Sequence, residues 1–391
     1  MSTANYNLCY MDPPQGDAIT RQPSLWSVPT PAPIQVSASI QALTPYEAVS
    51  SQAVIEARPD HKTSFKLDWN ESTIAPSPRV NEAIARALTD GRGLNWYPRL
   101  GSSELVEALV GYTGVIADCI LTTNGSDDAL NLICTSFLDR GDDVVIPVPT
   151  YNHFMVFAQS RGAVIRTTQG TDPFENNLDG IRSTLRPTTR LLYLVSPNNP
   201  TGVVYRAAEI EALCQEFPQT LIVLDEAYFE FAQETGIDLV ERYGNLIVTR
   251  TFSKAFGLAG LRVGYLAAHP EIVAGLRRLY NPKSVNTLGQ IGAVAALGDL
   301  DYLNDYLSEV TQAKEILRRY FEHREVEAHI TPANFVVVRV ANVADTLATL
   351  ESRGVHVRDR SGYPGLEGCL RMTVGTVEQT LRLIERLQSV F

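Results

Sequence analysis

One lysine of this chain has unusual neighbours, within the segment Thr249–Tyr265 (TRTFSKAFGLAGLRVGY). Lys254 lies among small, hydroxyl and apolar residues in place of the charged neighbours of a surface helix, and Arg262 follows eight positions later. A lysine among apolar side chains is partly desolvated, and a desolvated amine can act as a nucleophile. The segment therefore predicts a reactive lysine with a cation close by.

A second segment, Thr122–Leu132 (TTNGSDDALNL), is a glycine turn that leads into an expected helix. Free backbone amides and the helix dipole at such a start favour an anion such as phosphate. Plain N-capping is the alternative. For this segment taken alone capping is the more common explanation, because Ser and Asp begin many helices.

Two further polar side chains close apolar runs. Asn199, in SPNNPTG, either belongs to a simple turn or offers a rigidly held amide to a ligand, because Asn-Pro and Thr-Gly form turns readily. Asp225, in VLDEAYFEF, ends an apolar strand, and Tyr228 follows three positions later. Burying a carboxylate without a partner is costly, so Asp225 is expected to bind a ligand or, alternatively, to form a structural ion pair or a helix cap.

One ligand accounts for all of these residues, namely a pyridine that carries an aldehyde and a phosphate tail. Lys254 would form a Schiff base with the aldehyde, and Asp225 would keep the ring nitrogen protonated. Tyr228 and Asn199 would bind the ring hydroxyl, while Tyr151 of PVPTYNHF would stack on the ring. The phosphate would bind at the helix start and to groups that flank the lysine: Gly125, Ser126, Asp127, Thr251, Ser253 and Arg262.

The elements that must position these residues alternate along the chain. Short apolar runs predict buried strands of parallel type, and the stretches between them predict helices. The expected strands are 142–148, 189–196, 220–227, 245–253 and 262–269, and two of the expected helices are 126–138 and 207–217. This order predicts a doubly wound α/β domain, in which ligands bind at strand ends.

The sequence also predicts a division into three parts. Residues 1–60 are rich in Pro, Ser, Gln and Ala and predict an N-terminal extension or arm that is at best partly ordered. Residues 61–285 would form the large domain, with part of the N-terminal segment joining the small one. Residues 286–391 would form a smaller α/β C-terminal domain, with helices over 291–323, strands at 334–340, 355–359 and 369–375, and a final helix.

Composition limits the partners and the location. The net charge of -11 over 391 residues argues against nucleic acid and anionic membranes as partners, while a local basic pocket for a small anion remains open. No apolar segment approaches about twenty residues, and the N-terminus lacks the order of a signal peptide. Five cysteines without paired metal spacing predict reduced core thiols in a cytoplasmic protein and no metal site: Cys9, Cys119, Cys134, Cys214 and Cys369.

The motifs NGSDD, PTY, SPNNPTG, DEAYFEF, TFSKAFGLAGLRVGY and LRMTVGT together resemble the fold-type I pyridoxal-phosphate aminotransferases (class I and II), and most closely the histidinol-phosphate aminotransferases. The resemblance runs from Leu67 to the C-terminus. It implies an aspartate-aminotransferase-like fold with a large, mostly parallel sheet, pyridoxal 5'-phosphate as cofactor, and a homodimer with shared active sites. Tyr97 of NWYP would reach the cofactor phosphate of the neighbouring subunit. L-glutamate, the common donor of the family, would supply the amino group, and Lys254 would move the proton.

The resemblance also implies two substrate arginines. Arg371 in CLRMTVGT matches the arginine that clamps the α-carboxylate through a two-pronged contact. Arg358 in VHVRDR matches a position that helps bind the substrate phosphate. Its alternative is a solvated arginine paired with Asp359 or Glu367.

The segment WNESTIAPSP departs from the family pattern. It keeps Asn70, a substrate-binding position of the family, but Ser72 to Ala75 bring neither the proline nor the aromatic residue that usually follows. The sequence therefore favours a smaller phosphorylated carbonyl acceptor, such as dihydroxyacetone phosphate in the synthesis of capsule or other polysaccharide precursors. A decarboxylase of phosphorylated amino acids, similar to threonine-phosphate decarboxylase, stays open as the alternative. A non-catalytic binding protein on the same scaffold is a third interpretation, which the complete set of cofactor motifs disfavours.

Overall fold

The computed structural model describes residues 34–44, 50–58, 63–90, 94–388 and 390–391. The chain divides into two compact units, 1–37 and 38–391, and of the first only the exposed residues 34–37 are described. Much of the predicted arm, with Cys9, therefore lies outside the described residues. The predicted division at 60 and 285 stays a prediction.

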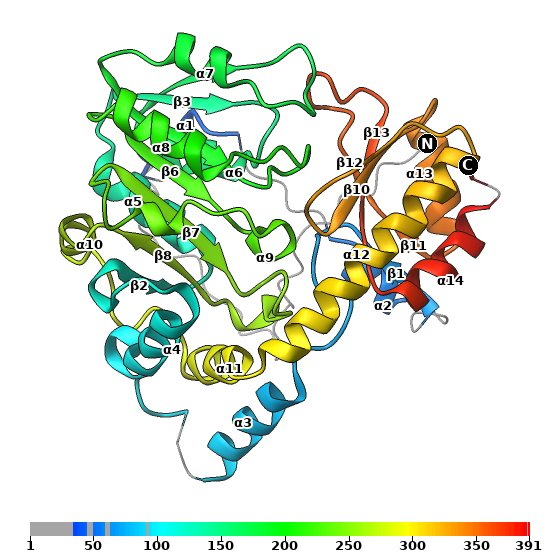
Figure 1. Cartoon of the computed structure of the whole chain (residues 1–391), viewed down its shortest axis with the longest axis horizontal. Coiled ribbons are helices and arrows are strands. Elements are labelled where there is room, and N and C mark those ends of the chain that lie inside the picture. The colour runs from blue at the N-terminus through cyan, green and yellow to red at the C-terminus, as the bar shows by residue number, and fades with distance from the viewer. Residues whose placement is uncertain (1–33, 45–49, 59–62, 91–93, 389) are drawn as a thin grey trace, which may run out of the picture. The chain divides into compact units, whose positions relative to one another are not determined.

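A seven-stranded sheet forms the centre of the second unit (Figure 1). Its strand order is β2-β8-β7-β6-β5-β3-β4, and strands β3 to β7 run parallel. The strands are β2 (Ile120–Thr123), β3 (Asp143–Pro147), β4 (Val164–Thr168), β5 (Thr189–Val195), β6 (Leu221–Asp225), β7 (Leu246–Thr251) and β8 (Gly264–Ala268). The predicted mostly parallel sheet is confirmed.

The predicted parallel direction of the strand at 262–269 is wrong. Strand β8 is antiparallel to both β7 and β2. The connection between β7 and β8 contains only the short 3-10 helix Ala259–Leu261. A parallel strand needs a longer crossover, usually through an α-helix, so this connection returns the chain antiparallel. The turn that carries Lys254 follows from this short return.

Helices cover both faces of the sheet, because alternate residues of its strands point to opposite sides. One core joins β-strand residues such as Val144 and Val223 to α5 (Ser126–Phe137), α6 (His153–Ser160) and α10 (Pro270–Leu276). The other core joins residues such as Val145 and Ile222 to the helices of the opposite face. These are α3 (Pro78–Thr89), α4 (Ser103–Thr113), α7 (Leu178–Thr184), α8 (Ala207–Glu216) and α11 (Thr287–Leu297). The helices predicted at 126–138 and 207–217 are α5 and α8.

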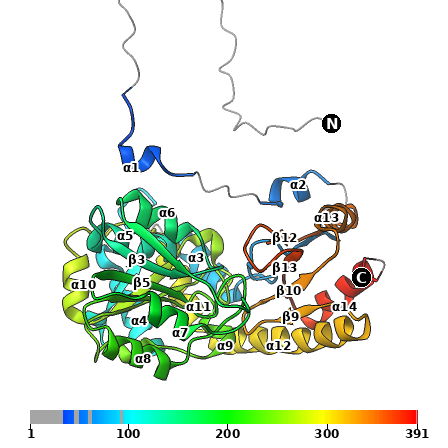
Figure 2. The same cartoon turned by 90° about the horizontal axis from the view of Figure 1, so that it is seen from above.

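A smaller sheet follows along the chain. Its antiparallel strands have the order β12-β13-β10-β9: β9 (Ala328–Ile330), β10 (Phe335–Arg339), β12 (Arg358–Asp359) and β13 (Cys369–Thr373). Its core includes side chains of α12 (Leu300–His323) and α14 (Val377–Leu387), with α13 (Val343–Ser352) nearby. Figure 2 shows this group beside the helices around the large sheet, with α12 reaching from one to the other, and Leu303 of α12 joins a core of the large sheet.

Two details of this region differ from the sequence expectation. The strand predicted at 355–359 is two strands, because β11 (Val355–His356) pairs with β1 (Phe65–Lys66), whereas β12 pairs with β13. The helices predicted over 291–323 are α11 and α12, but α11 begins earlier, at Thr287, and packs in a core of the large sheet. The short helices α1 (Ala38–Gln41) and α2 (Gln52–Glu56) precede β1.

Two further observations concern the described part of the chain. Its four cysteines are buried and free, as expected for reduced core thiols. None of its helices is both long enough and apolar enough to cross a membrane.

Candidate active site

A cavity of about 1080 Å³ lies at the carboxyl ends of β5, β6 and β7, where it is lined by Val195, Asp225 and Thr251. Residues of the smaller sheet and of the segment after β1 complete its wall. The cavity brings together twelve of the residues singled out from the sequence: Ser126, Asp127, Tyr151, Asn199, Asp225, Tyr228, Thr251, Ser253, Lys254, Arg262, Arg358 and Arg371.

Asp225 is a buried carboxylate that is only half satisfied. Its Oδ2 accepts a hydrogen bond of 2.8 Å from the Tyr193 hydroxyl, whereas Oδ1 has no partner among the described residues. Burial raises the pKa of Asp225 to about 6, although the Tyr193 hydrogen bond acts in the opposite direction. An N–H group in the cavity would satisfy Oδ1 and favour the ionised carboxylate.

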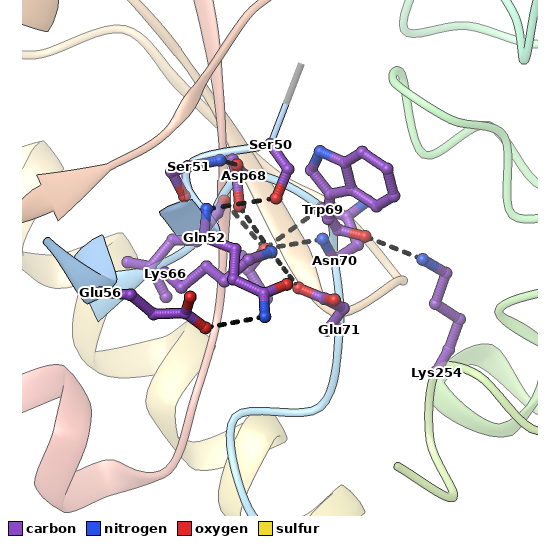
Figure 3. Close-up of polar contacts among 12 residues, drawn as sticks. Ser50, Ser51, Gln52, Glu56, Lys66, Asp68, Trp69, Asn70, Glu71 and Lys254 are labelled. Atoms are coloured by element: carbon purple, nitrogen blue, oxygen red, sulfur yellow. Dashed lines mark hydrogen bonds and ion pairs between the residues drawn. The ribbon is translucent and has the colours of Figure 1, made fainter. Parts of the chain in front are cut away.

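Lys254 lies three residues after the end of β7 and is half-buried. Its Nζ donates a hydrogen bond of 2.8 Å to the backbone carbonyl of Trp69, as Figure 3 shows. The same Nζ lies 5.7 Å from the centre of the Tyr228 ring. The amine therefore points across the cavity toward the segment that follows β1.

Hydroxyl, guanidinium and amide groups gather at the start of α5. Arg262 Nη1 donates to Ser253 Oγ over 3.3 Å, and the Thr251 hydroxyl donates to the same oxygen over 3.0 Å. Arg262 Nη2 also lies 3.6 Å from the Asp127 carboxylate. Because the first amides of an α-helix lack intrahelical acceptors, this end of the cavity can bind an anion.

Two glycines make the close approach at this end possible. Gly125 has φ +85, and a Cβ there would lie 2.6 Å from Arg262 Nη2. A Cβ on Gly264 would lie 2.7 Å from the carbonyl carbon of Gly125 and 2.8 Å from the amide nitrogen of Ser126. Any larger residue at position 264 would push β8 away from the start of α5.

Asn70 is buried behind Tyr228 and does not line the cavity. It has φ 53, a conformation that asparagine tolerates better than most residues. Its side-chain Nδ2 donates to the Tyr228 hydroxyl over 3.0 Å, and its backbone N–H donates to Thr373 Oγ1 over 3.1 Å. The predicted contact of Asn70 with substrate stays a prediction, whereas the hydrogen bond from Asn70 to Tyr228 is present in the structure.

Arg371, in β13, is the buried cation of the cavity. Its Nη1 donates to Asn199 Oδ1 over 2.6 Å, and its Nη2 donates to the backbone carbonyl of Asp68. Burial, together with the positive charges of the neighbouring Arg360 and Arg358, lowers the pKa of Arg371 to about 9. A carboxylate in the cavity would relieve both effects by supplying an opposite charge.

Arg358 lies opposite Arg371 in the pairing of β12 with β13, and it is half-buried on the cavity wall. Tyr97, in contrast, is 80% exposed and is not among the residues that line the cavity in a single subunit. The Lys283 Nζ lies 5.6 Å from the centre of its ring. The expected contact of Tyr97 with the neighbouring subunit stays a prediction.

Comparisons with known proteins decide the family. Residues 62–387 match the family described as aminotransferase class I and II. The chain belongs to this family. A dihydroxyacetone phosphate transaminase of Campylobacter jejuni is 37% identical over 91% of this chain and 97% of that protein. A histidinol-phosphate aminotransferase of Methanococcoides burtonii is 34% identical over 83% of this chain and 90% of that protein.

Solved structures agree. A histidinol-phosphate aminotransferase of Sinorhizobium meliloti, in complex with pyridoxal 5'-phosphate, has a TM-score of 0.82 and 28% identity, over 92% of this chain and 98% of that chain. An aspartate aminotransferase of Thermus thermophilus, with a TM-score of 0.74 and 21% identity, shares the fold. This aminotransferase therefore has the fold type I architecture and uses pyridoxal 5'-phosphate. The named relatives give no support to the decarboxylase alternative.

The cavity of this aminotransferase fits pyridoxal phosphate on its own geometry. The unsatisfied Oδ1 of Asp225 suits the ring N–H, and the start of α5 with Arg262 suits the phosphate. Lys254 supplies an amine between these two ends. Each of these groups was expected from the sequence.

Sequence reasoning missed three residues of this aminotransferase site. Tyr193 binds Asp225, and its position inside a buried strand was a signal, because a buried tyrosine hydroxyl usually has a partner. Arg360 lines the cavity two positions after Arg358, and such spacing places both on one face of a strand. Trp69 also lines the cavity, three positions before Ser72, where the segment without the usual aromatic residue begins.

Proposed function

We propose that this aminotransferase moves the amino group of L-glutamate to a small phosphorylated carbonyl compound, with dihydroxyacetone phosphate as the acceptor. The observation that carries the proposal is the pairing of Arg358 with Arg371 on the wall of the cavity that holds Lys254. Two cations beside one amine suit substrates with two anionic ends. The relative named as a dihydroxyacetone phosphate transaminase supports this acceptor.

The roles of the cofactor-side residues follow from their contacts. When bound, pyridoxal phosphate supplies a ring that accepts electrons and carries the amino group between donor and acceptor. Asp225 would hold a proton on the ring nitrogen, and Lys254 Nζ would be the amine that holds the cofactor covalently. The same Lys254 amine would move the proton at the α-carbon of the donor. Tyr228 and Asn199 would hold the ring hydroxyl, and Tyr151 would cover the ring.

The start of α5 would hold the phosphate of the cofactor. Backbone amides, hydroxyls and one guanidinium would bind it there, from Gly125, Ser126, Asp127, Thr251, Ser253 and Arg262. The Asp127 carboxylate accepts a hydrogen bond of 2.8 Å from the Tyr151 hydroxyl. Asp127 thereby fixes Tyr151 over the ring.

Each of the two substrate-side arginines would bind a different anionic group of the substrate. Arg371 binds the α-carboxylate of glutamate with two N–H groups, which lysine would be unable to supply in the same geometry. Arg358 binds the phosphate of the acceptor in one half-reaction and the side-chain carboxylate of glutamate in the other. Asn70 would contact the substrate, and its hydrogen bond to Tyr228 also holds a residue of the cofactor side.

The reaction balances without a further reagent. Glutamate gives its amine nitrogen to C2 of dihydroxyacetone phosphate and becomes 2-oxoglutarate. The acceptor loses its carbonyl oxygen as water, and a second water supplies the new carbonyl oxygen of 2-oxoglutarate. The donor is oxidised by two electrons and the acceptor is reduced by two.

The wider setting is also part of the proposal. The enzyme would be a homodimer in which Tyr97 reaches the cofactor phosphate of the other subunit. Large apolar side chains beside Tyr97 are exposed in a single chain, which supports an interface there: Leu94, Trp96 and Leu100 are 64%, 78% and 62% exposed. We place the enzyme in the cytoplasm, with residues 61–285 and 286–391 as its domains, in a pathway to polysaccharide precursors.

The test is full turnover with L-glutamate and dihydroxyacetone phosphate. We expect 2-oxoglutarate and a phosphorylated amino alcohol in equal amounts, identified by mass. Rapid turnover of imidazole-acetol phosphate with none of dihydroxyacetone phosphate would refute the acceptor. Release of carbon dioxide from a phosphorylated amino acid would refute transamination.

A further inference from the structure

Trp69 is a large aromatic side chain whose place on the cavity wall has no role in the proposal above. Its side chain is 38% exposed, although a tryptophan of a folded domain usually buries most of its surface. Trp69 lines the same cavity as Lys254, Arg358 and Arg371. A ligand in the cavity is therefore within reach of Trp69.

The backbone of Trp69 is tied to the reacting group. Its carbonyl accepts the hydrogen bond of 2.8 Å from Lys254 Nζ, so the indole and the acceptor of this amine belong to the same residue (Figure 3). On the C-terminal side, Asn70 donates to the Tyr228 hydroxyl over 3.0 Å. Movement of the Trp69 backbone away from the cavity would disturb both of these contacts.

The N-terminal side of Trp69 is held as firmly. The Asp68 carboxylate accepts the amide of Ser51 over 2.9 Å and the Lys66 ammonium over 3.0 Å, as Figure 3 shows. The Asp68 carbonyl accepts a hydrogen bond from Arg371. Segments before β1 and after β12 therefore fix the residue that precedes the indole.

The indole itself has a cationic neighbour. The Lys66 Nζ lies 5.5 Å from the centre of the Trp69 ring, within the range of a cation–π contact. Lys66 is in turn ion-paired with Asp68 and Glu71. These contacts favour one orientation of a side chain that has only two rotatable bonds.

We infer that Trp69 determines the size of the acceptor, by favouring a short phosphorylated carbonyl compound over one that bears an aromatic ring. The inference rests on the proposed function and deepens it. A pinned indole beside Lys254 takes up space that a ring-bearing substituent of the acceptor would need. Because the backbone is held on both sides, Trp69 keeps its position when a larger substrate enters. The enzyme then discriminates between the two substrates through the steric conflict of the larger one with the indole.

The test compares two substrates in one set of variants. For the holoenzyme, Trp69→Ala and Trp69→Phe, kcat and KM are measured with dihydroxyacetone phosphate plus L-glutamate and with histidinol phosphate plus 2-oxoglutarate. We expect Trp69→Ala to move the ratio of the two kcat/KM values toward histidinol phosphate by about ten-fold or more, the scale of steric discrimination in enzyme pockets. Trp69→Phe should move the ratio less, because a smaller ring remains.

A matched control is Leu381→Ala on α14, which removes another exposed apolar side chain at 52% exposure, outside the cavity. Its substrate ratio should equal that of the unmodified enzyme. The change with Trp69→Ala should appear mainly in KM for the larger substrate, whereas a loss of folded protein would lower kcat equally for both. If Trp69→Ala does not fold, Trp69→Phe carries the comparison.

The outcomes separate the two claims. An unmodified enzyme that prefers dihydroxyacetone phosphate, with the same ratio in both Trp69 variants, would overturn the inference and leave the proposed function standing. A weaker use of histidinol phosphate in Trp69→Ala would also overturn the inference, since the indole would then be a stacking surface. An unmodified enzyme that uses only histidinol phosphate would overturn the proposed acceptor itself.

Discussion

Replacing Asp225 by asparagine should separate catalysis from stability. The substitution keeps the size of the side chain and an oxygen that can accept the Tyr193 hydrogen bond of 2.8 Å. It removes the negative charge that holds a proton on the ring nitrogen of the cofactor. We therefore expect the two properties to change in opposite directions.

The stability effect follows from the pKa of Asp225. Burial raises this pKa from 3.8 to about 6, which corresponds to about 3 kcal/mol against the ionised form in the cofactor-free fold. Because the folded-state pKa lies above the unfolded one, the folded protein binds the proton more tightly. The contribution of Asp225 to the free energy of unfolding is therefore highest below pH 3.8 and is lost as the pH rises through 6.

At pH 7.5 an asparagine avoids the full cost of about 3 kcal/mol, but its amide N–H groups need acceptors and lose about 1–3 kcal/mol if they find none. Cofactor-free Asp225→Asn should therefore be as stable as the unmodified protein or more stable by up to about 3 kcal/mol. At pH 5 the benefit falls to about half, because Asp225 is then mostly protonated in the folded state. Turnover with glutamate should fall at least about a hundred-fold, the usual cost of losing one preorganised electrostatic group.

Two assays on the same preparations test this. Urea unfolding of the cofactor-free proteins at pH 5 and 7.5 gives the stability, and kcat with L-glutamate gives the activity. Asp179→Asn, at a fully exposed carboxylate of α7, is the control and should change neither quantity. Loss of several kcal/mol of stability together with activity would refute the reasoning, because Asp225 would then be a structural residue. Full activity in Asp225→Asn would refute it as well.

Three other substitutions test other parts of the site. Arg371→Lys should raise KM for L-glutamate by about 10- to 100-fold in steady-state assays, because lysine loses the two-pronged contact; an unchanged KM would contradict the assignment. Gly264→Ala should lower the free energy of unfolding by about 1–3 kcal/mol and weaken cofactor retention in gel filtration, because its Cβ would lie 2.8 Å from the amide nitrogen of Ser126. Tyr193→Phe removes a donor that lowers the pKa of Asp225, so the fall in cofactor-free stability should extend to higher pH in urea titrations, and an unshifted profile would exclude this coupling.

The parts of the account that the sequence predicted are those that depend on local pattern. Apolar runs located the strands of the large sheet, and residues at their ends, such as Asp225 and Asn199, reached one cavity because parallel strands end at the same edge. Lys254, predicted to be a reactive lysine, lines the same cavity because it follows closely after the end of β7. The direction of β8 was missed, because the pattern of a buried strand does not reveal its direction.

The parts that were missed depend on contacts between distant segments. The Trp69 carbonyl accepts a hydrogen bond from Lys254, which lies 185 positions away in the chain. The local sequence around either residue therefore does not predict this contact. Arg371 reaches Asp68 across 303 positions in the same way. The split of 355–359 into β11 and β12 also required two separate partners, β1 and β13. Tertiary packing decides these features, and a periodicity does not encode it.

The most direct measurement of the central claim is the half-reaction with L-glutamate alone. Purified protein loaded with pyridoxal phosphate is mixed with excess L-glutamate without an acceptor, and 2-oxoglutarate and carbon dioxide are quantified beside the Lys254→Ala variant. The account predicts one equivalent of 2-oxoglutarate per subunit, no carbon dioxide, and neither product from a folded variant that still binds the cofactor. Carbon dioxide in place of 2-oxoglutarate, or an equal yield from Lys254→Ala, would contradict it.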